Sequence, residues 1–400
     1  MSPRRLARSA IERGVISRRV QGLSPSGIRK FFDLVSTMQD AISLGVGEPD
    51  FPTPWHISEA AISGIEKGYT MYTSNLGMPE LRHELSHDLE RRFGLEYDPE
   101  TELLITVGVS EALDLAMRAI LDPGDEVISP EPTYVAYSSC AILAGGEFVP
   151  VPTTCENSFK VKAADIDQRV TARTKAILLG YPNNPTGAVM DRPDLEEIAA
   201  VAERHDLLVV SDEIYDQLVY GVEHTCFASL PGMRDRTILL GGFSKAYAMT
   251  GWRVGYAAAR AEIIEAMTKI HQYTMLCAPI TGQMAAIEAL RSGQSAVREM
   301  VADYDRRRRV MVKGLNAIGL TCCEPRGAFY AFPSVRVTGL SSNDFAERLL
   351  VEEKVAVVPG SVFGESGEGY VRCCYATALP DIREALRRME RFVETHSPKR

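Results

Sequence analysis

Residues 241–256 read GGFSKAYAMTGWRVGY and contain one lysine, Lys245, within a run of small and apolar side chains. A charged amine is costly to keep in such surroundings, so we expect the pKa of Lys245 to be lowered and its amine to be nucleophilic. Arg253 follows eight positions later (253 − 245), and arginine is well suited to holding a phosphate. Together they indicate a Schiff base to a phosphorylated aldehyde, of which pyridoxal 5'-phosphate (PLP) is the common example.

The composition is that of a globular protein. The chain has 400 residues, of which 45% are hydrophobic and 24% are charged, enough for about two or three domains and a large core. The net charge of −9 gives no general attraction to nucleic acid or to an anionic membrane. No apolar run approaches the about 20 residues of a membrane span. We therefore expect neither nucleic acid nor a membrane as a partner.

The first 22 residues differ from the rest because they carry six arginines and a single acid, Glu12. Such a start is typical of an organellar targeting segment, but a flexible arm or a misassigned start codon explains it equally. The eight cysteines include no C-x-x-C pair. We interpret them as reduced thiols and expect a cytoplasmic location.

The middle of the chain alternates strand-like with helix-like segments. Leu113, Met117 and Ile120 have helical spacing, and a second helix is expected over 194–204. Short apolar runs predict strands at 103–107, 126–129, 175–179, 207–211 and 236–240. This βαβ pattern predicts an α/β fold whose mostly parallel sheet is flanked by helices.

A second, smaller α+β domain is predicted after a long helix over 300–315. That helix carries Arg306–Arg309, which we interpret as a solvated face. Isolated strands and shorter helices follow, at 328–332, 342–352, 355–358, 370–375 and 382–393. The predicted division is an N-terminal arm (1–22), a segment that joins the small domain (23–48), a large PLP-binding domain (49–305) and the small C-terminal domain (306–400).

Ligands of an open parallel sheet bind beyond the carboxyl ends of its strands, and several loops there carry suitable groups. Ser110 is expected to cap a helix whose free N–H groups suit a phosphate. Asn184 lies in the rigid loop YPNNPTG, where its amide can donate. Asp212 can pair with a protonated pyridine nitrogen, Tyr215 can donate to the ring oxygen, and Tyr134 can stack. Each also has a plain structural explanation, as a helix cap or a core side chain.

Eight motifs occur in order along the chain: LGVGEPDF, YTSNLGMPELR, PEPTY, YPNNPTGAV, SDEIY, GFSKAYAMTGWRVGY, GAFYAFP and YVRCCYATA. Together they make the chain resemble a fold-type-I PLP enzyme, specifically a class I/II aminotransferase. Within that family it most resembles the archaeal-type aromatic aminotransferases. The resemblance extends from about residue 20 to about residue 393.

The resemblance implies a role for each candidate residue. Lys245 would bind PLP covalently and then move a proton of the substrate, while Asp212 would pair with the pyridine nitrogen. Asn184 and Tyr215 would bind the ring oxygen, and Tyr134 would stack on the ring. The implied phosphate ligands are the Val109 backbone, Ser110, Ser244, Arg253 and, from the partner subunit of a homodimer, Tyr72. The implied ligands of the substrate carboxylate are Arg372, the Gly47 backbone and Asn184.

The implied reaction moves the amino group of an L-amino acid, aromatic or of broad range, to a 2-oxo acid, with 2-oxoglutarate as the expected acceptor. Many relatives have a serine where this chain has Gly242, and we expect Ser244 to compensate. Some aspartate-preferring relatives carry a charge where Ser110 or Gln272 stands here, which argues against a strictly dicarboxylate-selective pocket. Candidates for an apolar substrate pocket are Leu23, Ile28, Phe329 and Tyr330.

Three other functions fit parts of the sequence. A PLP-dependent carbon–sulfur β-lyase or other PLP lyase shares the same motifs and first steps, and a requirement for a 2-oxo acid separates it from a transaminase. A non-catalytic PLP-binding module has no use for Lys245. His83-Glu84-Leu85-Ser86-His87 fits the H-E-x-x-H pattern of zinc metalloproteases. However, a leucine stripe on the same helix is expected to turn both histidines toward solvent.

Overall fold

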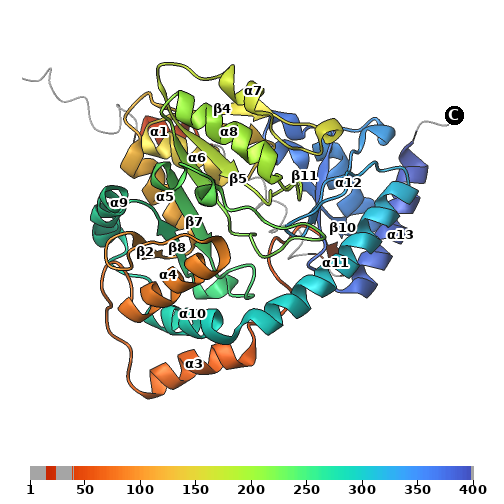
Figure 1. Ribbon diagram of the computed structural model, residues 1–400. Helices are drawn as coiled ribbons and strands as arrows, with labels where there is room; N and C mark the ends of the chain where they lie inside the picture. The colour runs from red at the N-terminus through yellow and green to blue at the C-terminus, as the bar shows by residue number, and fades with distance from the viewer. Residues whose placement is uncertain (1–14, 24–37, 39, 398–400) are drawn as a thin grey trace, which may run out of the picture.

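The fold is built around one sheet of seven strands, seen near the centre of Figure 1. The computed structural model describes residues 15–23, 38 and 40–397. The strands are β2 (Leu103–Thr106), β3 (Glu126–Glu131), β4 (Glu147–Pro152), β5 (Thr174–Gly180), β6 (Leu208–Asp212), β7 (Thr237–Gly242) and β8 (Gly255–Ala258). Their order is β2-β8-β7-β6-β5-β3-β4, and β8 runs antiparallel to both of its neighbours while the other pairs are parallel. The predicted mostly parallel sheet is confirmed.

Helices cover both faces of this sheet, which explains why its central strands are apolar at successive positions. In β6, Val209 packs into one core cluster and the adjacent Val210 into another, because neighbouring side chains of a strand point to opposite faces. The first cluster includes α8 (Arg192–Arg204), and the second includes α5 (Val109–Ile120) and α9 (Ala261–Thr274). The remaining helices of this part are α3 (Trp55–Glu66), α4 (Pro79–Phe93), α6 (Ala136–Ala144), α7 (Ala163–Asp167) and α10 (Ile280–Ser292), with the short α1 (Arg18–Gln21) before them.

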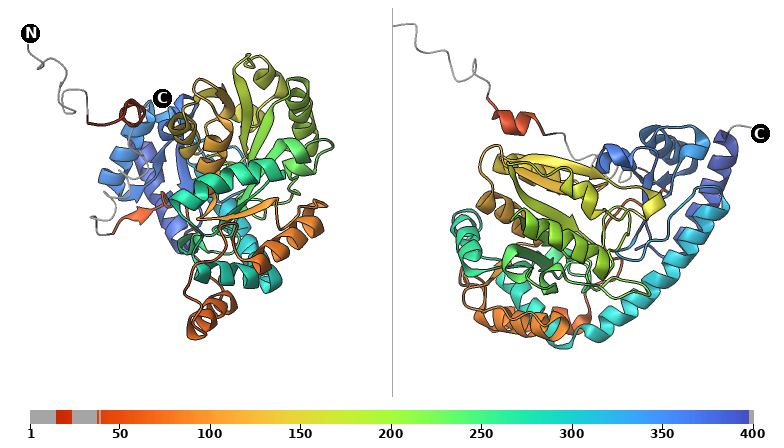
Figure 2. Two further views of the ribbon diagram at one scale, coloured as in Figure 1. Left: turned by 90° about the vertical axis from the view of Figure 1, so that its left-hand side faces the viewer. Right: turned by 45° about the horizontal axis from the view of Figure 1, so that its top comes forward.

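The C-terminal elements form a second group beside the sheet, coloured blue in Figures 1 and 2. The long helix α11 (Gln294–Ala317) leads into them, and α12 (Ser342–Glu353) and α13 (Leu379–His396) follow. Three short strands pair in the order β11 (Val358–Pro359), β12 (Val371–Cys374) and β9 (Tyr330–Ala331). A separate pair joins β1 (Ile42–Ser43) to β10 (Val355–Ala356). The division into domains stays a prediction, and most of its 23–48 segment lies outside the described residues.

The interpretation of Arg306–Arg309 as a solvated face is wrong for the middle two residues. Arg307 and Arg308 are 7% and 6% exposed. The Arg307 guanidinium pairs with Asp50 at 2.7 Å, and that of Arg308 with Glu324 at 2.7 Å. Arg307 connects α11 to a distant loop at Asp50, and Arg308 connects it to the loop that follows the helix, so the tertiary structure uses charges that the local pattern places in solvent.

The expectation of eight reduced thiols is also wrong for one pair. Cys155 and Cys323 are joined in a disulfide, and their Cα atoms lie 5.9 Å apart. Folding brings together two positions separated by 168 residues, a contact that the spacing of cysteines in the sequence does not reveal. The free cysteines are Cys140, Cys226, Cys277, Cys322, Cys373 and Cys374.

The H-E-x-x-H segment lies on α4, where Leu85 is buried and both His83 and His87 are exposed. The predicted orientation of the two histidines is confirmed. Over the described ranges, no group of three or more His, Cys, Asp or Glu side chains is placed to hold a metal ion. Nor does any helix in the described part of the chain have the length and apolarity needed to cross a membrane.

Candidate active site

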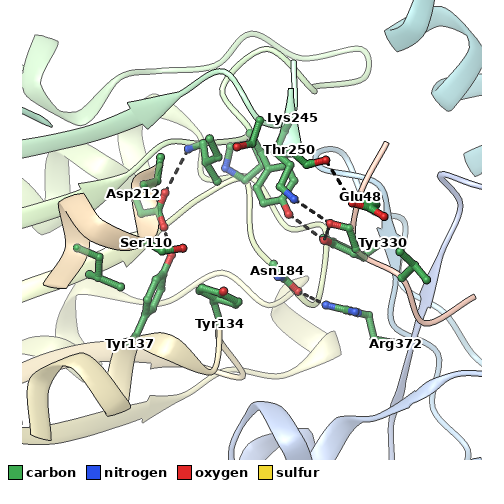
Figure 3. Close-up of a pocket in the computed structure, with 18 of the residues that line it drawn as sticks. Glu48, Ser110, Tyr134, Tyr137, Asn184, Asp212, Lys245, Thr250, Tyr330 and Arg372 are labelled. Atoms are coloured by element: carbon green, nitrogen blue, oxygen red, sulfur yellow. Dashed lines mark hydrogen bonds between the residues drawn. The ribbon is translucent and has the colours of Figure 1, made fainter. Parts of the chain in front are cut away.

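A cavity of about 500 Å³ lies at the carboxyl ends of the central strands, next to the C-terminal elements. Figure 3 shows Asp212 on one side of it, Arg372 on the other, and Lys245 between them at the top. The predicted site residues that line it are Gly47, Val109, Ser110, Tyr134, Asn184, Asp212, Tyr215, Ser244, Lys245, Arg253 and Arg372. Tyr72 does not line it and is 80% exposed. One cavity therefore gathers residues that the sequence scatters over more than 300 positions (372 − 47).

Lys245 follows the end of β7 and points into the cavity (Figure 3). Its Nζ donates a hydrogen bond to the Gly47 carbonyl at 2.8 Å. The rings of Tyr215 and Phe329 lie 5.9 and 5.8 Å from the same atom. The pKa of Lys245 is lowered to about 8, chiefly by burial; Cys374 opposes this shift, and the nearby Arg372 contributes to it. The expected lowering is confirmed, and a larger share of the amine is unprotonated near neutral pH than in water.

Asp212 is the last residue of β6, as predicted, and is 6% exposed. Its carboxylate accepts hydrogen bonds from the Tyr137 hydroxyl at 2.9 Å and from the Ile214 backbone N–H at 3.2 Å. Burial raises the pKa of Asp212 to about 6, and these two hydrogen bonds oppose the rise. A buried carboxylate is stabilised by a cation beside it, so the position suits a protonated ring nitrogen.

Tyr137 is a site residue that the sequence reasoning missed. It lines the cavity and holds Asp212 through the hydrogen bond above. The available signal was proximity in the sequence, because Tyr137 lies in the first turn of α6, three positions after Tyr134 and just beyond the PEPTY motif. Gly180, at the end of β5, leaves the room for the Tyr137 hydroxyl, since a Cβ there would collide with it.

The start of α5 and Arg253 form an anion-binding corner. Gly108, not Ser110, caps the helix, with φ of 75°, and Ser110 lies within the first turn. The expectation for Ser110 as the cap is thus wrong. A Cβ on Gly108 would lie 2.5 Å from Arg253 Nη2, and a Cβ on Gly255 would lie 2.6 Å from the Val109 nitrogen. Glycines therefore permit the guanidinium to approach the free N–H groups of the helix, an arrangement that suits a phosphate.

A serine at Gly242, the position where many relatives carry one, would be tightly packed in this chain. A Cβ there would lie 3.0 Å from Val109 Cγ2 and 3.2 Å from the Val254 carbonyl oxygen. Ser244, which lines the same cavity, is the nearby hydroxyl. The departure from the family pattern thus has a packing reason in this structure.

Arg372 lies in β12 and is 2% exposed. Its Nη1 donates to Asn184 Oδ1 at 2.9 Å and its Nη2 to the Gly45 carbonyl at 2.7 Å. Its buried Nε has no hydrogen-bond partner among the described residues. A buried guanidinium with a free donor is stabilised by an anion, so the site fits a carboxylate. The hydrogen bond from Arg372 Nη1 also occupies Asn184 Oδ1 and leaves the Asn184 amide hydrogens available to donate.

The aromatic residues divide between cavity and core. Tyr134 lines the cavity and meets Tyr137 edge-on, with ring centroids 5.7 Å apart. The Tyr215 hydroxyl lies 2.8 Å from that of Tyr330, which also lines the cavity. Phe329 does not line the cavity and belongs to the core. Of the other pocket candidates, Leu23 is not at the cavity and Ile28 lies outside the described residues.

Comparison with known proteins agrees with this geometry. Residues 39–389 match the family described as aminotransferase class I and II. The chain is 48% identical to an aspartate aminotransferase of Pyrococcus abyssi over 94% of this chain and 98% of that protein. It is 46% identical to aromatic-amino-acid aminotransferase 2 of Thermococcus litoralis over 95% and 98%. The crystal structure of an aromatic aminotransferase from Pyrococcus horikoshii superimposes with a TM-score of 0.88 at 46% identity, over 92% of this chain and 99% of that one.

The raised pKa of Asp212 predicts how stability depends on pH in protein prepared without cofactor. Burial favours the protonated carboxyl, so its contribution is fully present below the ordinary pKa of 3.8 and is lost as pH rises through about 6. Two pKa units correspond to roughly 3 kcal/mol of unfolding free energy. Asp212→Asn cannot ionise, and we expect urea unfolding at several pH values to show a smaller loss of stability across this range.

The matched control is Asp235→Asn, whose side chain is 75% exposed and which should follow the wild type. Equal pH dependence of Asp212→Asn and the wild type would show that the buried carboxyl does not titrate in this range.

Proposed function

The chain belongs to the class I and II aminotransferases, and on that premise we propose how its own residues serve the reaction. The protein is a PLP-dependent enzyme that transfers an amino group from an amino acid to a 2-oxo acid. The family and the relatives described above are all aminotransferases, so the lyase alternative is not favoured. The residue assignments depend on one observation: Lys245 shares a cavity with a buried carboxylate and a buried guanidinium, Asp212 and Arg372.

PLP, when bound, supplies an electron sink for the bond that breaks at the substrate Cα. The residues present fit it, because the cavity offers an anion-binding corner, a buried carboxylate and an amine with a lowered pKa. Asp212 would hold the proton on the ring nitrogen, and Tyr134 would pack against the ring. Asn184 and Tyr215 would donate to the ring oxygen. The phosphate would be held by the Val109 N–H, Ser110, Ser244 and Arg253.

Arg372 would bind the substrate α-carboxylate, assisted by the Gly47 backbone. It lies across the cavity from Asp212 (Figure 3), so the carboxylate and the ring nitrogen are held at opposite ends. Lys245 Nζ lies between them and would take the Cα proton and later return it. Its pKa of about 8 suits both transfers, because a group that titrates near the working pH can act as base and then as acid.

Replacement of Lys245 tests the central assignment. We expect Lys245→Ala to lose amino transfer by at least about a thousandfold, since both the covalent anchor and the proton carrier are removed. The measurement is transfer to 2-oxoglutarate, together with borohydride reduction to detect covalently bound cofactor. Lys269→Ala, on an exposed surface of α9, should behave as the wild type. Covalent cofactor retained in Lys245→Ala would show that another amine holds it.

We propose that the amino donor is aromatic or of broad range. Relatives with aspartate and with aromatic names are about equally similar to this chain. In support of the aromatic choice, the cavity is lined by the rings of Tyr134 and Tyr330, and no cation stands at Ser110 or Gln272. Steady-state rates with a panel of donors should give aromatic amino acids a kcat/KM roughly tenfold above that of aspartate. A higher value for aspartate would contradict this preference.

We also propose a homodimer. Tyr72 lies in a segment beside the end of α9, because Asn75 Nδ2 donates to the Leu276 carbonyl at 2.7 Å. Large apolar side chains are exposed along α3, this segment and the end of α9: Trp55, Ile62, Ile65, Tyr69, Met71, Tyr72, Tyr273, Met275 and Leu276. Apolar surface of this extent is costly to leave in water. A second copy that covers it would carry Tyr72 to the phosphate site of its partner.

A mixing experiment tests the cross-subunit role of Tyr72. Tyr72→Ala should weaken PLP binding, and Lys245→Ala should be inactive. Hybrid dimers of the two would contain one site with both changes and one wild-type site, so mixing after subunit exchange should restore activity. Failure to restore activity, with hybrids shown to form, would place Tyr72 in its own subunit's site or outside any site.

A cytoplasmic location stays a prediction. The same holds for any targeting role of the arginine-rich start, of which residues 1–14 lie outside the described residues.

A further inference from the structure

We propose that Tyr330 is a positioning residue with two separable parts: its hydroxyl directs the hydrogen of Tyr215 into the cavity, and its ring holds the guanidinium of Arg372. The inference rests on the proposed function, because it concerns the residues assigned to the ring oxygen and to the substrate carboxylate. It extends that function by connecting the two ends of the site through one side chain.

The hydroxyl of Tyr330 has a defined position. Tyr330 lies in β9 opposite Cys374 of β12 and is 1% exposed, yet it lines the cavity. Its oxygen lies 2.8 Å from the Tyr215 hydroxyl oxygen and 3.5 Å from the Gly47 carbonyl oxygen. A Cβ at Gly47 would lie 2.6 Å from the same hydroxyl. The glycine therefore provides the space that the Tyr330 hydroxyl occupies.

Two hydroxyls at 2.8 Å share one hydrogen, and either can donate it. If Tyr215 donated to Tyr330, its single hydrogen would be used and could not reach a ring oxygen. The other acceptor open to Tyr330 is the Gly47 carbonyl, but 3.5 Å is at the limit of a hydrogen bond. With a ring oxygen present as an acceptor for Tyr215, donation from Tyr330 to Tyr215 is the direction that lets both hydroxyls donate. It also makes Tyr215 a stronger donor, since linked hydrogen bonds polarise one another.

The ring of Tyr330 faces the carboxylate end of the site. The Arg372 guanidinium carbon lies 4.5 Å from the Tyr330 ring centroid and 5.0 Å from that of Phe363. A cation over an aromatic face is stabilised by the ring quadrupole. The contact adds to the hydrogen bonds that Arg372 makes with Asn184 and Gly45. Removing the hydroxyl of Tyr330 would leave the contact between its ring and the Arg372 guanidinium intact, whereas removing the ring would abolish that contact.

Both hydroxyls act as neutral donors. Burial raises the pKa of Tyr215 and of Tyr330 well above that of an ordinary tyrosine, although Arg372 opposes the rise in both. The groups that act on this pair are Arg372, Cys374 and Tyr134. Those that act on Lys245 are Cys374, Arg372, Glu48 and Arg253, and Lys245 in turn acts on Asp212. A change of pH that titrates Lys245 or its link to the cofactor thus leaves the two tyrosines protonated.

The test of the hydroxyl is the visible absorption of PLP bound to the full-length enzyme, followed against pH. In Tyr330→Phe a weaker donation to the ring oxygen leaves more negative charge beside the nitrogen that joins Lys245 to the cofactor. We expect the midpoint of the titration to rise by about half to one pH unit. Tyr215→Phe should give a larger rise, and the double variant should match Tyr215→Phe alone, because the hydroxyl of Tyr330 acts through Tyr215.

Three results would overturn the role of the hydroxyl. The first two are a midpoint that does not change in Tyr330→Phe and a midpoint that falls. The third is a rise on adding Tyr330→Phe to Tyr215→Phe that equals the rise on adding it to the wild type. A wild-type enzyme that takes up no PLP would overturn the proposed function and this inference with it, whereas the three results above leave the proposed function intact.

The test of the ring is the binding of butyrate, a carboxylate with no aromatic ring to contact Tyr330 and no amino or oxo group to react, to the same loaded enzymes. We expect Tyr330→Phe to keep the dissociation constant within about twofold and Tyr330→Leu to raise it by about fivefold or more. Equal effects of the two substitutions, or no effect of either, would remove the role of the ring. If Tyr330→Leu does not fold, Tyr330→Met, which keeps a long apolar side chain without the aromatic face, takes its place.

Discussion

The structure depends on burying charged and polar groups at one cavity while leaving some of their bonding capacity free. Arg372 has an unpartnered Nε, and Asp212 is a carboxylate whose pKa is raised by burial. Lys245 sits between them with its pKa lowered. Each is unfavourable alone, because a protein interior solvates charge poorly. A cofactor with a protonatable ring and a phosphate, and a substrate with a carboxylate, would provide the missing partners.

The fold makes this arrangement possible by delivering the groups from different places. Asp212 ends a central strand, Lys245 follows the neighbouring strand, and Arg372 comes from the small C-terminal sheet. Helices on both faces of the main sheet account for its apolar strands, so the polar groups gather at the strand ends, where the sheet stops and the C-terminal elements begin (Figure 1). Close packing at glycines such as Gly108 sets how near Arg253 can come to the helix start.

Two further residues, Tyr137 and Tyr330, hold the groups of the site in position. Tyr137 orients Asp212, and Tyr330 lies between the donor Tyr215 and the guanidinium of Arg372. Their shared property is a buried hydroxyl with a defined partner, and such groups fix the direction of a hydrogen bond as well as its existence. A reaction in this cavity would then depend on where each hydroxyl hydrogen points, and Tyr137 and Tyr330 set those directions.

The sequence by itself predicted the α/β class, the strands β2, β3, β5, β6 and β7 of the main sheet, and most of the residues that line the cavity, because apolar periodicity and strand-end motifs are local signals. It did not predict β4, β8 or the order of the strands in the sheet, which arise only from pairing between distant segments. It missed Tyr137, placed the cap of α5 on Ser110 instead of Gly108, and assigned Arg307 and Arg308 to solvent. It also left Cys155 and Cys323 unpaired. Those features were decided by the tertiary structure, since each depends on a partner or a backbone angle that arises only when distant segments, such as α11 and the loop at Asp50, come into contact.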